Sequence, residues 1–336
     1  MKAMVLDQIA PVSKAPLRLR ELPELEPQAG EVRIKVRCCG VCRTDLHVIE
    51  GDLPRRKLPV ICGHQVVGIV DKVGPRCQLL KVGQRVGIPW LRKTCGQCAY
   101  CRAGKENLCE FSVYTGYDAD GGYAESAIVP EAYAYVIPDV FDDVHAAPLL
   151  CAGIIGYRSL KRADLPPGGR LAMYGFGSSA HIILQIALHR GSEVFVVTRG
   201  ESHRQLAREM GATWVGESAA EMPAKVNSGI MFAPAGNLVP DAMAQLDKGG
   251  TLALAGIYMS EIPGLDYTRT LFYEKNIRSV TANTREDGRE LLAEAASILL
   301  RPHVTTYPLA QANRALVDLK EDRVNGTAVL IPPSGE

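Results

Sequence analysis

The first ninety residues alternate apolar and polar positions in short runs that proline and glycine separate. Such alternation is typical of half-buried β-strands. We expect strands at residues 4–6, 17–19, 32–36, 65–70 and 82–88. Glycines at positions 63, 68, 74, 83 and 87 indicate a strongly bent sheet or a partial barrel. Motifs rich in cysteine and histidine are expected in the loops between these strands.

A different pattern begins near residue 170, where apolar runs of strand length alternate with helical segments. Strands are expected at 170–174, 193–198, 213–215, 230–232 and 251–257, with a further apolar run at 277–282. Helices are expected at 182–188, 206–210 and 238–246. This alternation predicts a doubly wound parallel sheet. The tail is expected to form helices at 290–299 and 311–319 and a strand at 328–330, which should rejoin the first domain.

Length and composition indicate a folded protein of two domains. Of the 336 residues, 47% are hydrophobic and 22% charged, which allows sizeable cores. A net charge of +1 gives no support to nucleic-acid binding or to electrostatic membrane anchoring. No stretch approaches the roughly eighteen apolar residues of a membrane span, and the N-terminus lacks a signal-peptide core. We therefore expect a soluble, cytoplasmic protein with neither nucleic acid nor membrane as a partner.

Ten cysteines are many for a reducing compartment, where disulfides rarely persist, so metal binding is the better explanation. Cys42 lies in Gly-Val-Cys-Arg-Thr-Asp-Leu-His, His64 in Cys-Gly-His-Gln and Cys151 in Leu-Leu-Cys-Ala-Gly. Two sulfurs and one imidazole would make a zinc site with an open fourth position, as catalytic zinc uses. Thr44 and His47 beside it suit proton removal at a metal-bound oxygen. The alternative for each residue is a packed core side chain.

Four further cysteines, separated by two, two and seven residues, form the least ambiguous motif: Cys95, Cys98, Cys101 and Cys109. They can close tetrahedrally on one ion if the chain folds as a lobe. Four thiolates leave no position for water or substrate, so we expect a structural zinc. The alternatives are an iron–sulfur cluster, which the spacing disfavours, and disulfides, which a reducing compartment disfavours.

A glycine turn follows the expected strand at 170–174 and is formed by Gly175, Phe176, Gly177, Ser178 and Ser179. Strand, glycine turn, helix and strand within about thirty residues are the context in which G-x-G-x-x-[GA] predicts dinucleotide binding. Gly177 would let the backbone approach a pyrophosphate, and the helix N-terminus would supply free N–H groups.

The end of the strand at 193–198 distinguishes the two nicotinamide cofactors. An acid there would favour NAD(H), but the chain has Thr198 and Arg199, followed by Arg204. A hydroxyl followed by arginines tolerates a 2′-phosphate, so NADP(H) is favoured over NAD(H). The alternative is that the arginines are solvated residues at a helix start, and Glu201 in the same loop keeps NAD(H) open.

These motifs, together with Ile88-Pro89-Trp90, resemble the zinc-dependent medium-chain alcohol dehydrogenases over essentially the whole chain, and especially bacterial members near the cinnamyl alcohol dehydrogenase group. The resemblance implies an α/β protein with a GroES-like, β-rich catalytic domain at 1–151 and 285–336. This domain would hold one catalytic and one structural zinc. A Rossmann domain would occupy 152–284. The implied reaction is reversible hydride transfer between a small primary or secondary alcohol and NAD(P), in a homodimer or homotetramer.

The resemblance also assigns roles near the metal. Cys42, His64 and Cys151 match the ligands of the catalytic zinc. Thr44 matches the hydroxyl that touches the zinc-bound alcohol. His47 matches the far end of a proton relay that passes through the cofactor ribose.

Further roles are implied around these positions. Asp45 matches the carboxylate that orients the zinc-binding histidine, Arg43 a pyrophosphate contact and Trp90 a wall of the substrate pocket. Looser matches to backbone that meets the nicotinamide are Ala255, Gly256, Ile257 and Asn283.

The chain departs from the family in three places. Gln65 follows His64 where glutamate is common, Ile155 stands where a threonine near the nicotinamide is frequent, and the ribose-binding acid is absent. Alternatives on the same fold are a polyol dehydrogenase, an enoyl reductase and a zinc-binding structural or redox-sensing protein. Enoyl reductases of this fold usually lack both zinc sites, and a sensor would need no relay of hydroxyl and imidazole.

Overall fold

The structure, a computed structural model, describes residues 1–54 and 56–333 and divides into two compact units. Unit 1 comprises Met1–Cys151, Ala282–Ala296 and residues 302–333, and unit 2 comprises Ala152–Thr281 and Ser297–Arg301. The second segment of unit 1 thus starts at Ala282, before the expected residue 285, and residues 297–301 belong to unit 2. In the described part of the chain, no helix has the length and apolar character needed to cross a membrane.

Unit 1 is built on a seven-stranded sheet around the long strand β3 (Glu31–Val41). One edge of β3 pairs first with β9 (Ser126–Pro130) and then with β18 (Thr327–Ile331), while its other edge pairs with β5 (Val66–Val73). Two register shifts against β5 and the change of partner bend the sheet, as the glycine pattern predicted. The remaining strands are β6 (Arg85–Ile88), β10 (Tyr135–Val136) and β17 (Val304–Pro308).

A smaller sheet in unit 1 has the order β2-β1-β4. Its strands are β1 (Lys2–Leu6), β2 (Leu17–Glu21) and β4 (Val60–Ile61). The helices of unit 1 outside the four-cysteine segment are η1 (Val12–Lys14), α1 (Arg43–Glu50), η3 (Glu131–Tyr133), α3 (Asp143–Ala146), η4 (Ala147–Leu150), α9 (Arg285–Ser297), η7 (Leu309–Gln311) and α10 (Ala312–Lys320).

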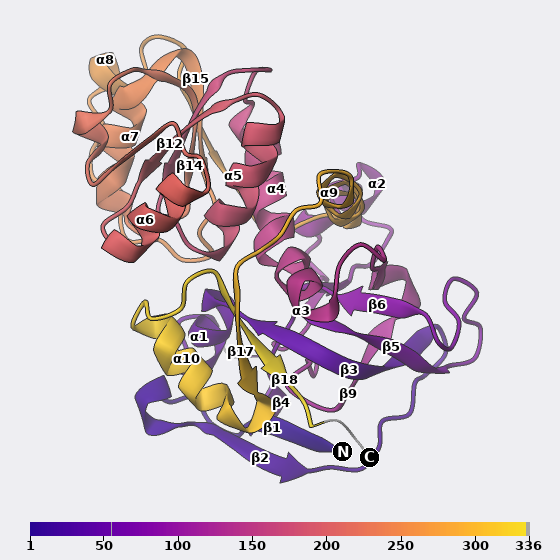
Figure 1. The fold of residues 1–336 in the computed structure, drawn as a ribbon. Coiled ribbons are helices and arrows are strands. Elements are labelled where there is room, and N and C mark those ends of the chain that lie inside the picture. The colour runs from indigo at the N-terminus through magenta and orange to yellow at the C-terminus, as the bar shows by residue number, and fades with distance from the viewer. Residues whose placement is uncertain (55, 334–336) are drawn as a thin grey trace. The chain divides into compact units, whose positions relative to one another are not determined.

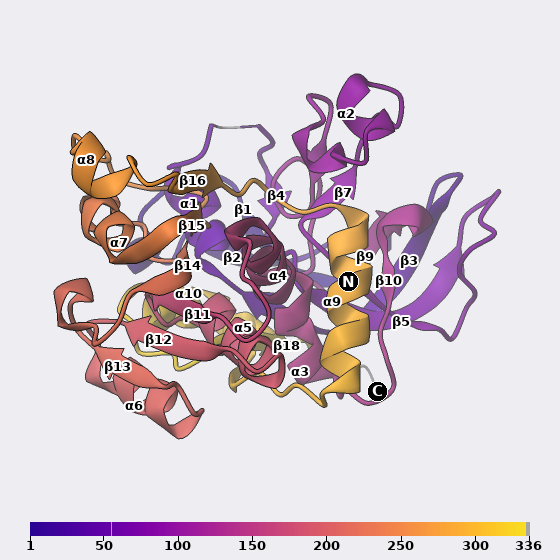
Figure 2. The same ribbon diagram turned by 90° about the horizontal axis from the view of Figure 1, so that it is seen from above.

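The four cysteines lie between the two strands of a short hairpin. Strands β7 (Leu91–Lys93) and β8 (Val113–Tyr114) pair antiparallel, and the chain between them carries α2 (Ala99–Arg102) and η2 (Glu106–Leu108). We call residues 94–112 the lobe. In Figure 2 its helix α2 projects beyond the end of β7.

Unit 2 is a doubly wound, six-stranded parallel sheet with the order β13-β12-β11-β14-β15-β16, as predicted. Figure 1 shows α4 and α5 on one side of this sheet and α6 and α7 on the other. Its strands are β11 (Arg170–Tyr174), β12 (Glu193–Val197), β13 (Trp214–Gly216), β14 (Val226–Met231), β15 (Leu246–Leu254) and β16 (Asn276–Ser279). Its helices are α4 (Ala152–Ala163), α5 (Ser178–His189), α6 (Glu201–Glu209), η5 (Ala219–Glu221), η6 (Gly236–Leu238), α7 (Val239–Gln245) and α8 (Tyr267–Thr270).

One expectation about unit 1 is wrong. The motif at 40–47 was expected in a loop, but from Arg43 onward it forms the first turns of α1. The physical reason is that Leu46, Val48 and Ile49 turn one apolar face of the helix into the core, while Asp45 caps its first turn.

Candidate active site and structural metal centre

Three ligand-type side chains that are far apart in the sequence meet in unit 1. Cys42 is the N-cap of α1, His64 lies in the loop between β4 and β5, and Cys151 lies between η4 and α4. Cys42 Sγ is 3.1 Å from His64 Nε2 and 4.0 Å from Cys151 Sγ. The three potential ligand atoms all lie within 4.8 Å of one another.

This donor set fits a zinc ion. Zn–S bonds of about 2.3 Å and Zn–N bonds of about 2.0 Å place tetrahedral ligand atoms roughly 3.6–3.8 Å apart. The distances of 3.1 and 4.0 Å bracket that separation. Three protein donors are the number that catalytic zinc sites use, with water or substrate as the fourth ligand. Two thiolates and a neutral imidazole only balance the charge of the ion, so it would stay electrophilic.

The pKa values of Cys42 and His64 depend on burial and on the neighbouring groups of the cluster. The hydrogen bond with Cys151 and burial raise the pKa of the Cys42 thiol well above its ordinary value. Burial lowers the pKa of His64, but the nearby Cys42 and Asp45 charges outweigh it and raise that pKa to about 10. A divalent cation at the centre would favour the opposite states, thiolate and neutral imidazole, which are the forms that bind metals.

Asp45 connects the two segments that carry Cys42 and His64. Its carboxylate is 1% exposed and accepts the backbone N–H of Cys42 at 2.9 Å and that of Gly63 at 3.2 Å. Asp45 Oδ1 also lies 3.3 Å from His64 Nδ1. A carboxylate on one ring nitrogen fixes the ring so that the other nitrogen faces the sulfurs, which is how metal-binding histidines are commonly oriented.

Thr44 and His47 lie three residues apart on α1, which places them on one face of the helix, and both are partly exposed. His47 Nδ1 pairs with Asp52 Oδ2 at 2.8 Å. Gly51 ends the helix at φ +86°, a left-handed conformation that suits glycine, and turns the chain back toward His47. Sequence reasoning missed Asp52. The available signal was an acid directly after the glycine that ends a helix.

Trp90 packs against the ligand cluster. Its ring meets that of His64 edge-on, with centroids 4.8 Å apart, and stacks on Tyr114 at 4.9 Å and on Tyr117 at 5.8 Å. Gln65, next to His64, is fully buried, and neither polar atom of its amide has a hydrogen-bond partner among the described residues.

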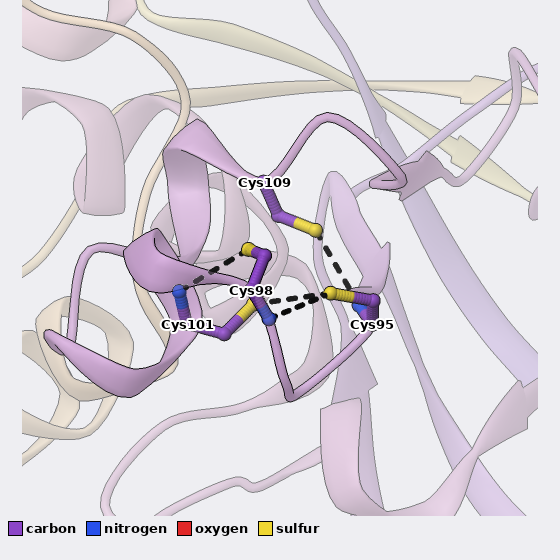
Figure 3. A group of neighbouring side chains, drawn as sticks. All are labelled: Cys95, Cys98, Cys101 and Cys109. Carbon is purple, nitrogen blue, oxygen red and sulfur yellow. Dashed lines mark hydrogen bonds between the residues drawn. The ribbon is translucent and has the colours of Figure 1, made fainter.

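The four cysteines of the lobe form a second cluster (Figure 3), with all four sulfurs within 4.8 Å of one another. Cys95 Sγ and Cys101 Sγ are 3.9 Å apart, close to the roughly 3.8 Å expected around zinc. Backbone N–H groups donate to three of the sulfurs at 3.3–3.5 Å. The N–H groups of Gln97 and Cys98 lower the pKa of Cys95 to about 6, whereas burial raises that of Cys109 to about 11. The cluster fits four thiolates on one zinc, and all ten cysteines of the described chain are free thiols.

The predicted glycine turn lies at the carboxyl end of β11 in unit 2. The order of the strands reverses between β11 and β14, which is where doubly wound sheets bind ligands. Gly175 has φ +92°, and a Cβ on it would lie 3.0 Å from the backbone nitrogen of Ala233. Gly177 is the N-cap of α5, with open space around the position of a Cβ. Phe176 is buried, and the next two residues, Ser178 and Ser179, begin the helix.

Of the two arginines predicted after β12, Arg204 is paired with other residues of the protein. Arg204 donates to Glu201 at 3.0 Å, to Glu217 at 2.6 Å and to the carbonyl oxygen of Arg199 at 2.7 Å, and its side chain is 11% exposed. Arg199 is exposed, and Thr198 is buried at the strand end. Arg199 is therefore the guanidinium of this pair that faces solvent.

The other residues predicted to bind the cofactor are divided between the two units. Arg43 pairs with Asp322 on the surface of unit 1, and Asn283, also in unit 1, donates from its amide to the carbonyl oxygen of Thr284 at 3.0 Å. Three others follow the carboxyl end of β15 in unit 2: Ala255, Gly256 and Ile257.

Comparisons with known proteins identify the family of the chain. Residues 28–139 match the alcohol dehydrogenase GroES-like domain and residues 180–297 the zinc-binding dehydrogenase domain. A probable alcohol dehydrogenase, AdhA, of Mycobacterium tuberculosis is 50% identical over 98% of this chain and 97% of its own length.

Two solved structures share the fold. A cobalt- and zinc-bound thermostable alcohol dehydrogenase from Pyrobaculum aerophilum is 26% identical, with a TM-score of 0.88 over 99% of both chains. A cinnamyl alcohol dehydrogenase from Sorghum bicolor is 25% identical, with a TM-score of 0.89 over 98% of this chain and 97% of its own. With both domain matches and full-length relatives, the chain belongs to the zinc-containing medium-chain alcohol dehydrogenase family.

Proposed function

We propose that this protein is a zinc- and NAD(P)-dependent dehydrogenase that reversibly oxidises a small primary or secondary alcohol to an aldehyde or ketone. The observation that carries the proposal is the convergence of Cys42, His64 and Cys151 at the start of α1, the helix that also carries Thr44 and His47. The lobe would hold a second, structural zinc through its four cysteines.

The residues around the cluster suit proton removal from an alcohol. Bound zinc lowers the pKa of a hydroxyl, and a bound nicotinamide accepts or donates hydride. The Thr44 hydroxyl would accept the proton of the alcohol as it gives up its own, and His47 would exchange a proton with solvent. Asp52, 2.8 Å from His47 Nδ1, orients the ring. Asp45 holds His64 in its ligand orientation.

We infer that NADP(H) is preferred over NAD(H). The end of β12 carries Thr198 and the exposed Arg199 instead of an acid that would bind the ribose hydroxyls. Arg204 holds this loop by donating to the backbone carbonyl oxygens of Thr198 and Arg199. Arg199 is the residue that we assign to the 2′-phosphate.

The aromatic wall at the cluster favours small substrates. Trp90 lies edge-on against His64 and is itself fixed between His64 and the stacked Tyr114. A large ring held against a ligand residue leaves less room for a bulky alcohol. The homodimer or homotetramer and the cytoplasmic location expected from the sequence stay predictions.

The test is a spectrophotometric assay of nicotinamide reduction and oxidation with a panel of alcohols, polyols and aldehydes, run with both cofactors. We expect turnover of simple alcohols and aldehydes with a higher kcat/KM for NADP(H), and loss of turnover in Cys42→Ser. Turnover restricted to polyols would assign a polyol dehydrogenase. No turnover with any of them, in protein of full zinc content, would contradict the proposal and favour a sensing or structural role.

A further inference from the structure

The lobe contains almost no apolar core of its own. Between residues 95 and 112, the buried side chains are Glu106, Asn107 and Cys109. Helix α2 has no buried residue. The position of the lobe therefore depends on the metal and on polar contacts with the rest of unit 1.

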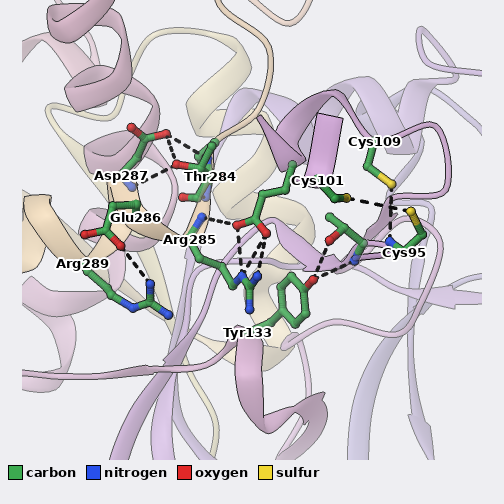
Figure 4. Close-up of polar contacts among 12 residues, drawn as sticks. Cys95, Cys101, Cys109, Tyr133, Thr284, Arg285, Glu286, Asp287 and Arg289 are labelled. Atoms are coloured by element: carbon green, nitrogen blue, oxygen red, sulfur yellow. Dashed lines mark hydrogen bonds and ion pairs between the residues drawn. The ribbon is translucent and has the colours of Figure 1, made fainter. Parts of the chain in front are cut away.

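The Cys109 end of the lobe is bound to α9 by a charged pair (Figure 4). Arg285 donates from Nε to Glu106 Oε1 at 3.0 Å and from Nη2 to Oε2 at 2.8 Å, and its backbone N–H also donates to Oε1 at 2.7 Å. Glu106 is 8% exposed. The carbonyl oxygen of Glu106 accepts the backbone N–H of Cys109 at 3.0 Å. The arginine thus holds the turn that presents the Cys109 sulfur.

The Cys95 end reaches the same guanidinium through an aromatic ring. Arg285 lies over the ring of Tyr133, 4.7 Å from its centroid. The Tyr133 hydroxyl accepts the backbone N–H of Thr94 at 3.0 Å and lies 2.7 Å from Thr94 Oγ1. Thr94 directly precedes Cys95. Thr94 and Tyr133 are 7% and 8% exposed, so water competes little for these contacts.

Helix α9 also has contacts that do not involve the lobe. Thr284 N–H donates to Asp287 Oδ2 at 2.9 Å and Asp287 N–H donates to Thr284 Oγ1 at 3.2 Å, which caps the helix at its first turn. A Cβ on Gly288 would lie 2.4 Å from the ring of Tyr135 in β10, so glycine lets the helix lie directly on that strand. The backbone that carries Arg285 is therefore held by contacts outside the lobe as well.

We propose that Arg285 is a positioning residue for the four-cysteine centre, which holds both ends of the lobe and thereby slows loss of its metal. This inference rests on the proposed zinc site in the lobe. Groups that orient metal ligands typically change metal affinity by about 10- to 100-fold when they are removed. Because Arg285 contacts Glu106 and Tyr133 but none of the residues of the Cys42 cluster named above, the effect is confined to one centre.

The test compares holoenzyme carrying Arg285→Ala with holoenzyme carrying Arg289→Ala. Arg289 lies one turn later on α9 and pairs at the surface with Glu286 at 2.9 Å, where both side chains are more than half exposed. Pulsed alkylation with N-ethylmaleimide, read by mass spectrometry, gives the reactivity of each cysteine. A chromogenic zinc chelator gives the rate of metal release.

Arg285→Ala is expected to raise the alkylation rates of the four lobe cysteines by about tenfold or more, with Cys42 and Cys151 unchanged. Arg289→Ala is expected to change neither set. Equal rates in both variants, or an increase at Cys42 and Cys151 as well, would overturn the proposal.

If Arg285→Ala does not fold, Tyr133→Phe decides, since it keeps the ring under Arg285 and removes the acceptor of Thr94. Faster alkylation of Cys95 supports the proposal, and an unchanged rate overturns it. Wild-type protein with fewer than two zinc ions per chain would instead refute the metal assignment itself, before any variant is compared.

Discussion

At the scale of single residues, Asp45 holds the segments of two predicted metal ligands, Cys42 and His64, in place. Its carboxylate accepts two backbone N–H groups and faces His64 Nδ1 at 3.3 Å, and it is buried. Asp45→Asn keeps the size of the side chain but removes the charge that orients the imidazole. We expect the zinc affinity of the first cluster to fall about tenfold or more, measured by competition with a chelator. Asp71→Asn, which changes a surface pair with Arg33, should leave that affinity unchanged.

Asp52 provides a second prediction at this scale, because it acts only through His47. We expect Asp52→Asn to lower kcat several-fold with full zinc content, since the ring loses the partner of its Nδ1 atom. In a His47→Gln background the same substitution should have little further effect. Additive losses in this double-mutant cycle would show that Asp52 acts elsewhere.

Some residues of the two sites were predicted from the sequence and others were not. Cys42, His64 and Cys151 could be found because each lies in a short motif of characteristic residues. Asp52 was missed although an acid after a helix-ending glycine was a usable signal, and Arg285 could not be found because its partners depend on which segments pack together. The exposed Arg199 and the internally paired Arg204 look alike in the sequence, and only their neighbours separate them.

At the scale of elements, the packing of α9 on β10 depends on the close approach of Gly288 to Tyr135. A Cβ at Gly288 would lie 2.4 Å from the buried ring of Tyr135. Gly288→Ala should therefore push the helix from β10 and lower the free energy of unfolding by about 1–3 kcal/mol, measured by urea denaturation. Gly264→Ala, where no atom lies within 4 Å, is the control. Equal stability of both variants would show that α9 can shift without cost.

Elements with a strong hydrophobic period were predicted, and several without one were not. The strands and helices of the parallel sheet in unit 2 are confirmed, because buried runs there are long and glycine separates them. Strands β8 and β10 have only two residues each, and none of the five residues of β17 is buried, so none of the three shows a hydrophobic period. Helix α1 was missed because its eight residues carry the polar groups of the site on one face.

At the scale of the whole molecule, the two metal centres should divide activity from stability. Cys42→Ser is expected to abolish turnover while the thermal melting temperature stays close to wild type. Cys109→Ser is expected to lower the melting temperature by about 4–8 °C. The reason is that the lobe has almost no apolar core and a structural zinc contributes folding energy. Equal losses of melting temperature in the two variants would contradict this division.

The measurement that tests the central claim most directly is diffraction at the zinc absorption edge from crystals of the purified protein. We predict two anomalous peaks per chain. One should lie about 2.0–2.3 Å from Cys42 Sγ, His64 Nε2 and Cys151 Sγ, and the other should lie among the four lobe sulfurs. A peak in the lobe with none at the first cluster would contradict the account, because the proposed chemistry requires a metal held by those three side chains.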